Sequence, residues 1–210
     1  TDARAVAAIY AAKGRPRFNP LIAHVADLAA AEREAVFDPL ARALAAAFWP
    51  GPLTLVLPRA TTATVADLVT AGLDTVALRM PANAVTRALI ARFGRPLAAP
   101  SANRSGHVSP TAAADVAADL GDAVAVILDD GPAPVGVEST IVAVADGRGV
   151  QLRPGGIPRA AIAAVAGRPV KTAAVPADPE RPQAPGMLVS HYAPRARVRL
   201  EATTVAPGEA

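Results

Sequence analysis

The sequence contains no cysteine, which excludes disulfide bonds, thiol nucleophiles and thiolate metal ligands. It has only three histidines, far apart in the chain, so a three-histidine zinc site would need all of them and transition-metal catalysis is not expected. Aromatic residues make up 3% of the chain. This is too few for the base-stacking platform on which many RNA-binding modules depend.

No apolar run of about 18 residues or more is present, and no basic-then-apolar leader is visible, so neither a membrane span nor a secretory signal is predicted. We therefore expect a cytoplasmic protein without membrane contact. Two catalytic signatures are also missing. Without Gly-x-x-x-x-Gly-Lys-Ser/Thr the chain is not a P-loop enzyme, and without Gly-x-Ser-x-Gly it lacks the nucleophile elbow of serine hydrolases.

Of the 210 residues, 52% are apolar and 19% are charged. This composition is sufficient for the core of one α/β domain, with a short additional segment. The formal charge of +3 says little about partners. Lys13, Arg15 and Arg17 lie close together in sequence. Charge alone allows three interpretations of this group: an anion site, an RNA-facing patch or a solvated surface.

A polar turn at residues 100–111 lies between an apolar stretch and an alanine-rich helical pattern. Ser101 and Asn103 offer short hydrogen-bonding side chains there, and a helix starting after Pro110 would direct its first N–H groups at an anion. The turn is typical of a phosphate site. An ordinary capped turn, with Ser109 as N-cap and Pro110 as the first helical residue, explains the same pattern equally well.

Apolar runs alternate with helical patterns along the chain, which indicates an α/β fold. Strands are expected at residues 21–25, 53–57, 75–79, 96–99, 124–128, 137–144 and 150–153. Arg79 ends one of them, and a guanidinium at the carboxyl end of a strand is well placed to hold a carboxylate. A surface salt bridge is the alternative role for Arg79. His24, inside an apolar run, is on its own more often a core residue than a ligand.

Several polar motifs occur in an order that resembles one family. They are Lys13-Gly14-Arg15-Pro16 with Asn19-Pro20-Leu21, and the segments at 49–54 (WPGPLT), 77–81 (ALRMP), 101–111, 137–141 (VESTI) and 152–155 (LRPG). Over about residues 1–168 the chain resembles the YrdC-type threonylcarbamoyl-AMP synthases. Residues 190–194 (SHYAP) resemble the linker motif of the two-domain branch of that family.

The resemblance implies a twisted, mostly mixed α/β sheet flanked by helices, with a concave basic face. It implies a catalytic domain at residues 1–170, a proline-rich linker at 171–194 that crosses the active site, and the start of a truncated C-terminal domain at 195–210. It also implies that the usual N-terminal strand and loop are missing. We then expect weak threonine binding, little adenylate formation and association through an unpaired sheet edge.

Members of this family condense L-threonine, bicarbonate or CO2, and ATP into threonylcarbamoyl-adenylate and release pyrophosphate. The resemblance implies Mg²⁺ bound with ATP and not by protein side chains, a downstream tRNA-modifying transferase complex as partner, and contact with double-stranded RNA or tRNA. Two alternatives stay open: a non-catalytic RNA-binding module that uses the same basic face, and a related carbamoyl-transfer domain of a larger maturation enzyme.

The resemblance also implies the site residues. The ATP site would comprise Arg15, Asn19, Thr75, Ser101, Asn103, Ser109, Arg153, His191 and Tyr192. Threonine would contact His24, Arg79, Ala99 and Ser139. Lys13 and Arg15 would be catalytic because they neutralise the charge of the phosphates.

Overall fold

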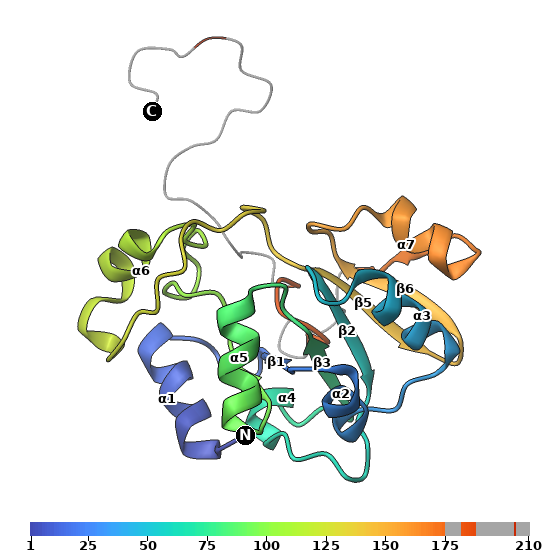
Figure 1. Cartoon of the computed structure of the whole chain (residues 1–210), viewed down its shortest axis with the longest axis horizontal. Helices are drawn as coiled ribbons and strands as arrows, with labels where there is room; N and C mark the ends of the chain where they lie inside the picture. Colours follow the sequence, from blue (N-terminus) through green and yellow to red (C-terminus); the bar gives the residue numbers. More distant parts are fainter. Residues whose placement is uncertain (175–181, 188–203, 205–210) are drawn as a thin grey trace.

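The computed structural model describes residues 1–174, 182–187 and 204. Within them, seven strands form one mixed sheet in the order β4-β1-β3-β2-β5-β6-β7. The strands are β1 (Ile22–His24), β2 (Leu53–Pro58), β3 (Thr75–Arg79), β4 (Leu97–Ala98), β5 (Thr140–Ala145), β6 (Arg148–Arg153) and β7 (Lys171–Thr172). The predicted α/β fold with a mixed sheet is confirmed, and Figure 1 shows the helices around that sheet.

Seven α-helices lie among the described residues. They are α1 (Ala3–Lys13), α2 (Leu28–Glu34), α3 (Pro39–Phe48), α4 (Asp67–Thr70), α5 (Ala84–Phe93), α6 (Ala113–Leu120) and α7 (Arg159–Ala166), with a 3₁₀ turn at Gly121–Ala123. The Asp2, Asp38 and Asn83 side chains cap the first turns of α1, α3 and α5, which satisfies N–H groups that lack a partner inside the helix.

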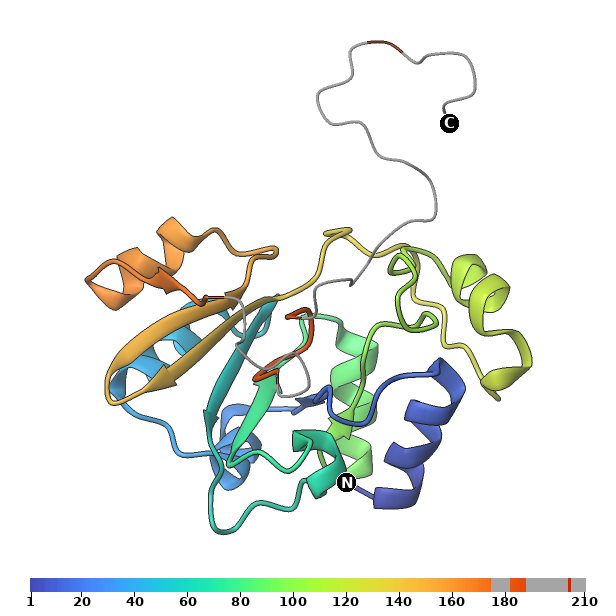
Figure 2. The ribbon, with the colours of Figure 1, turned by 180° about the vertical axis from the view of Figure 1, so that it is seen from behind.

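The two faces of the sheet are covered differently. Leu53, Leu55 and Leu57 alternate along β2 onto the face covered by helices, where they join the main core. Val56 points to the opposite face, in a smaller cluster with Ile22, Ala77, Ile141, Leu152 and Ala184. Ala184 belongs to the described segment 182–187, which lies across this second face of the sheet (Figure 2).

The prediction of a buried strand at residues 124–128 is wrong. No strand of the described sheet includes this segment, and the side chains of Val126 and Leu128 are 73% and 66% exposed. An apolar run becomes a strand only where a neighbour satisfies its backbone groups. Here the chain runs from α6 towards β5 without pairing with a neighbouring strand of the described sheet.

The start of α6 also differs from the prediction. Ser109 is not its N-cap and Pro110 is not its first residue, because the helix begins at Ala113. The carboxylate of Asp115 instead accepts the backbone N–H groups of Thr111 and Ala112. This acid in the first turn satisfies the N–H donors ahead of the helix, so Ser109 remains available for another contact.

None of the helices in the described ranges is both long and apolar enough to cross a bilayer.

Candidate active site

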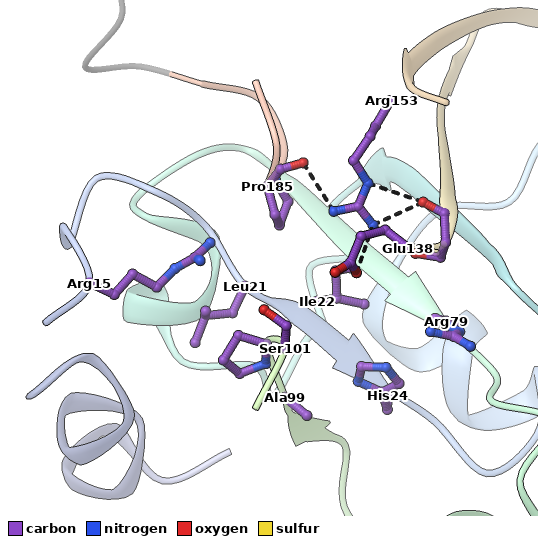
Figure 3. A pocket seen from close by; sticks show the side chains of 12 residues that line it. Arg15, Leu21, Ile22, His24, Arg79, Ala99, Ser101, Glu138, Arg153 and Pro185 are labelled. Atoms are coloured by element: carbon purple, nitrogen blue, oxygen red, sulfur yellow. Dashed lines mark hydrogen bonds and ion pairs between the residues drawn. The ribbon is translucent and has the colours of Figure 1, made fainter. Parts of the chain in front are cut away.

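The parallel pairing of β1 with β3 builds one wall of a cavity. Its register makes His24 the partner of Arg79, so both residues stand side by side at the carboxyl ends of their strands. A cavity of about 170 Å³ opens beside them. Its lining comprises Arg15, Leu21, Ile22, His24, Arg79, Ala99, Pro100, Ser101, Glu138, Ser139, Arg153 and Pro185 (Figure 3). Strand ends of this kind are the usual ligand sites of open α/β sheets.

A second wall comes from the start of β5 and the end of β6. The antiparallel pair of β5 and β6 sets Arg153 opposite Ile141, close to Ser139. Arg153 donates from Nε and Nη2 to the Ser139 carbonyl oxygen at 3.1 and 2.9 Å, and from Nη2 to Ser139 Oγ at 3.0 Å. Ser139 Oγ also lies 2.8 Å from Thr54 Oγ1. This wall is therefore rigid and almost fully buried.

The segment 182–187 approaches the cavity from the open face of the sheet. Arg153 Nη1 donates to the Pro185 carbonyl at 3.5 Å, and Figure 3 shows Pro185 beside the guanidinium. Gly186 has φ +87°, and a Cβ there would lie 2.5 Å from Arg153 Cδ. Only glycine suits this position, because any side chain would collide with the arginine.

Lys13 holds the predicted phosphate turn in place from behind. Its ammonium group donates to the carbonyl oxygens of Ser101, at 2.7 Å, and Asn103, and Ser105 N–H donates back to the Lys13 carbonyl. Asn103 Nδ2 donates to the His107 carbonyl at 2.7 Å, which closes the turn. Burial, with a smaller contribution from Arg15, lowers the pKa of Lys13 to about 8. Lys13 does not itself line the cavity.

Arg15 reaches the cavity from the loop after α1. Its Nη2 donates to the Pro20 carbonyl at 2.8 Å and its Nε to the Asn19 carbonyl at 3.3 Å. The Asn19 side chain is fully buried, and its amide group finds no hydrogen-bond partner among the described residues. Asn19 does not line the cavity, so of these two expected ATP contacts only Arg15 faces it.

A larger cavity, of about 450 Å³, adjoins the first. Arg79, Ser101 and Glu138 line both, which makes them the boundary between the two spaces. Ser109 lines the larger cavity and its hydroxyl donates to Glu138 Oε1. Glu138 was not among the predicted site residues. Its place directly before Ser139 in the VESTI motif was the available signal, but a single sequence does not reveal which way the side chain points.

Burial and neighbouring charge set the protonation of the strand-end pair. Burial, and then the positive charge of Arg79, lowers the pKa of His24 to about 4, so the imidazole is neutral at pH 7. Its Nδ1 is buried without a hydrogen-bond partner among the described residues. Burial also lowers the pKa of Arg79, Glu138 opposes that change, and Arg153 adds to it. The pair offers a ligand one fixed cation and one neutral ring.

The structure places most of the expected site residues at or beside the two cavities. Arg15, His24, Arg79, Ala99, Ser101, Ser139 and Arg153 line the first cavity, while Ser109 lines the second, and Lys13 and Asn103 support the turn between them. Thr75 lies at the other end of β3 from Arg79, on the same face, and is not among the residues lining the first cavity. His191 and Tyr192 lie outside the described residues.

The donor set does not suit a metal held by the protein alone. The described residues contain no group of three or more His, Asp or Glu side chains able to hold an ion, and Glu138 is the single carboxylate at the first cavity. Mg²⁺ is commonly bound by phosphate oxygens, water and one or two carboxylates. The one carboxylate at the first cavity is compatible with a Mg²⁺ ion bound chiefly by phosphate oxygens of a ligand and by water.

Comparison with known proteins identifies the family of the chain. The family model Sua5_yciO_yrdC, described as "Telomere recombination", matches residues 1–155, and a second family model, "Threonylcarbamoyl-AMP synthase, C-terminal domain", matches residues 157–209. Threonylcarbamoyl-AMP synthase of Bacillus subtilis is 49% identical over 199 residues, which cover 93% of this chain and 57% of that protein. The enzyme of the same name from Pyrococcus abyssi is 46% identical and is covered to 58%.

Solved structures of the same fold also match the chain. The crystal structure of P. abyssi Sua5 complexed with L-threonine matches with a TM-score of 0.85 at 46% identity, covering 93% of this chain and 57% of that one. E. coli YciO, at 20% identity and a TM-score of 0.64, shares the fold. The chain spans a little over half the length of these synthases. From the family match over most of its length and these relatives, the chain belongs to the Sua5/YciO/YrdC family.

Proposed function

We propose that this chain carries the catalytic unit of an L-threonylcarbamoyladenylate synthase, which joins L-threonine, bicarbonate or CO2, and ATP and releases pyrophosphate. The observation that carries the proposal is the strand-end pair of His24 and Arg79, aligned by the β1–β3 register. Facing them across one cavity are Ser139 and Arg153. The relatives named threonylcarbamoyl-AMP synthase supply the reaction.

Threonine occupies the first cavity in this proposal. Arg79 donates from Nε to the Gly51 carbonyl at 3.0 Å, which anchors the guanidinium and leaves its two Nη groups to hold a carboxylate. His24 is neutral, so it can hydrogen-bond the threonine hydroxyl without repelling Arg79. Ala99 and Ser139 close the remaining sides.

The nucleotide lies along the basic residues around the phosphate turn. Arg15 and Arg153 face the cavity, and Lys13 adds its charge from behind the turn. Together they favour the attack of a threonine carbamate oxygen on the α-phosphorus, with departure of pyrophosphate. No covalent enzyme intermediate is required. Mg²⁺ bound to ATP would screen the charge of the phosphates, alongside Arg15 and Arg153.

The organisation of the full sequence also follows as a proposal: a catalytic unit over residues 1–170, a linker over 171–194 that passes the site, and further C-terminal sequence from 195. The described part of that linker meets Arg153 at Pro185, which supports the assignment. The adenylate would then pass to a tRNA-modifying transferase complex.

The direct test is pyrophosphate release from ATP by the 210-residue chain, with threonine or bicarbonate omitted in turn and the product identified by mass spectrometry. The proposal expects release to need both, and D-threonine to be inert. Release that is indifferent to threonine would contradict it. Release that instead requires carbamoyl phosphate would favour the carbamoyl-transfer alternative.

A further inference from the structure

A zwitterionic amino acid needs both a cation and an anion from its site. The first cavity offers several positive side chains, those of Arg15, Arg79 and Arg153, but one carboxylate, that of Glu138. An exclusively cationic cavity would hold the carboxylate of threonine and repel its α-ammonium group. The negative charge of Glu138 would repel a phosphate group, so phosphate binding does not explain its presence in the cavity.

The backbone of Glu138 is fixed by the turn that follows β6. The Glu138 carbonyl accepts Gly156 N–H at 3.0 Å, and a Cβ on Gly155 would lie 2.3 Å from that same carbonyl oxygen. Only glycine permits this approach. The backbone from which the carboxylate extends is therefore held against the turn that follows β6.

One of the two carboxylate oxygens of Glu138 is already engaged. Oε1 accepts the Ser109 hydroxyl, while Oε2 lies 3.8 Å from Arg153 Nη2, which is an ion-pair distance too long for a hydrogen bond. The side chain is 28% exposed, and Figure 3 shows its carboxylate beside the Arg153 guanidinium. A carboxylate has about four acceptor positions, so Oε2 retains the capacity to accept a donor from a ligand.

The negative charge of Glu138 acts on cationic residues both behind the turn and at the strand end. It raises the pKa of Lys13 behind the turn and that of Arg79 at the strand end, against the effect of burial. A ligand whose carboxylate lies on Arg79 has its α-nitrogen attached to the carbon next to that carboxylate. The nitrogen then falls at the boundary between the two cavities, which Glu138 lines.

We propose that Glu138 is the residue that receives the α-ammonium group of the amino acid substrate and so makes the site selective for amino acids over hydroxy acids. The inference rests on the proposed function for its substrate and adds a specificity-determining residue to it. In this arrangement Arg79 and Glu138 hold the two charges of the zwitterion, and the nitrogen that must capture CO2 is oriented towards the nucleotide.

The test is isothermal titration of the 210-residue chain with L-threonine and with (R)-3-hydroxybutyrate, which keeps the carboxylate and hydroxyl but lacks the amino group. The wild-type chain should prefer threonine by roughly 10- to 150-fold, the range expected for a charged hydrogen bond. Glu138→Gln should lose most of this preference by weakening threonine binding, with (R)-3-hydroxybutyrate bound no more weakly than before.

Glu32→Gln, the same change on a half-buried residue of α2 that pairs with Arg42 away from the site, is the matched control and should keep the wild-type ratio. Equal weakening of both ligands by Glu138→Gln would overturn the inference, because it would mean that Glu138 only positions Arg153 and Ser109. Loss of MgATP affinity with threonine selectivity unchanged would overturn it as well. A wild-type chain that binds no threonine would overturn the proposed function itself, whereas normal binding with unchanged selectivity in Glu138→Gln would overturn this inference alone.

Discussion

The two sides of the cavity are built in different ways. On the strand side His24, Ser139 and Arg153 belong to the sheet or its immediate ends and are at most 9% exposed. On the turn side Ser101 and Ser109 lie in a loop without regular structure and are only partly buried. The sheet fixes one set by its register, whereas a few hydrogen bonds from Lys13 and within the turn fix the other.

The difference predicts which substitutions should lower the stability of the fold and which should lower ligand affinity alone. Groups buried in a sheet have already lost their water, so a change there leaves partners unsatisfied in the folded protein. Groups on a partly solvated turn can exchange a protein contact for water. We therefore expect strand-side changes to reduce the free energy of unfolding, and turn-side changes to act chiefly on ligands.

The largest expected effect is acid destabilisation through His24. The pKa of His24 is about 4 in the folded protein, against an ordinary value of 6.5. Between these two pH values the imidazole is protonated in the unfolded chain but neutral in the native state. The free energy of unfolding should fall by up to roughly 3 kcal/mol from this residue between pH 6.5 and 4. Urea denaturation across this range measures it.

His24→Asn is the test variant. His107→Asn is its control, because it makes the same change at a half-exposed imidazole that pairs with Asp119. His24→Asn should flatten the acid limb of the stability profile, and His107→Asn should leave the His24 part of that limb in place. An unchanged acid limb in His24→Asn would show that His24 is solvated, and the contrast between the two sides would fail.

The next effect compares one chemical change on each side. Ser139→Ala removes a buried hydroxyl that contacts Thr54 and Arg153 and should lower the free energy of unfolding by about 1–3 kcal/mol. Ser109→Ala, on the turn, should change it by no more than about 0.5 kcal/mol. Thermal denaturation of the two variants measures the two losses in stability. Equal losses would mean that the turn is as rigid as the strands.

Arg79→Lys tests the strand side through a ligand. The charge is kept but the two parallel N–H donors are lost, so threonine binding should weaken by about 1–3 kcal/mol while ATP binding stays nearly intact. Calorimetry with each ligand gives both values, and Arg87→Lys on α5 is the control. A collapse of ATP affinity with unchanged threonine affinity would move Arg79 to the nucleotide.

Local signals in the sequence predicted much of the fold. The apolar runs at 53–57 and 75–79 predicted β2 and β3 to within one residue of their observed bounds, because a strand buried on both faces is apolar almost throughout. The run at 124–128 was misassigned because burial of a strand depends on distant neighbours, about which the run itself says nothing.

The site was less accessible to local reasoning. That Arg79 ends a strand was visible in the sequence, but its alignment with His24 depends on a parallel pairing between strands over 50 residues apart. The family resemblance brought such residues together. It omitted Glu138, whose importance comes from being the one carboxylate among several cations, a property of the assembled cavity.

The smallest effect expected is a pH dependence of nucleotide binding from Lys13, on the turn side. Burial lowers its pKa to about 8, so the free protein loses this positive charge as the pH rises through 8. ATP is attracted by the charged form, and its affinity should be level below pH 8 and fall above it by up to about tenfold per pH unit. Titrations with ATP from pH 7 to 9.5 measure this dependence.

Lys13→Arg keeps its charge throughout this range and should abolish the decline, whereas Lys171→Arg, at an exposed position on β7, should retain it. Threonine affinity should stay level over the range where its own amino group remains protonated, because Lys13 lies behind the turn and not against the strand side. A decline of equal slope in Lys13→Arg would assign the titration to another group and leave the turn with a purely structural lysine.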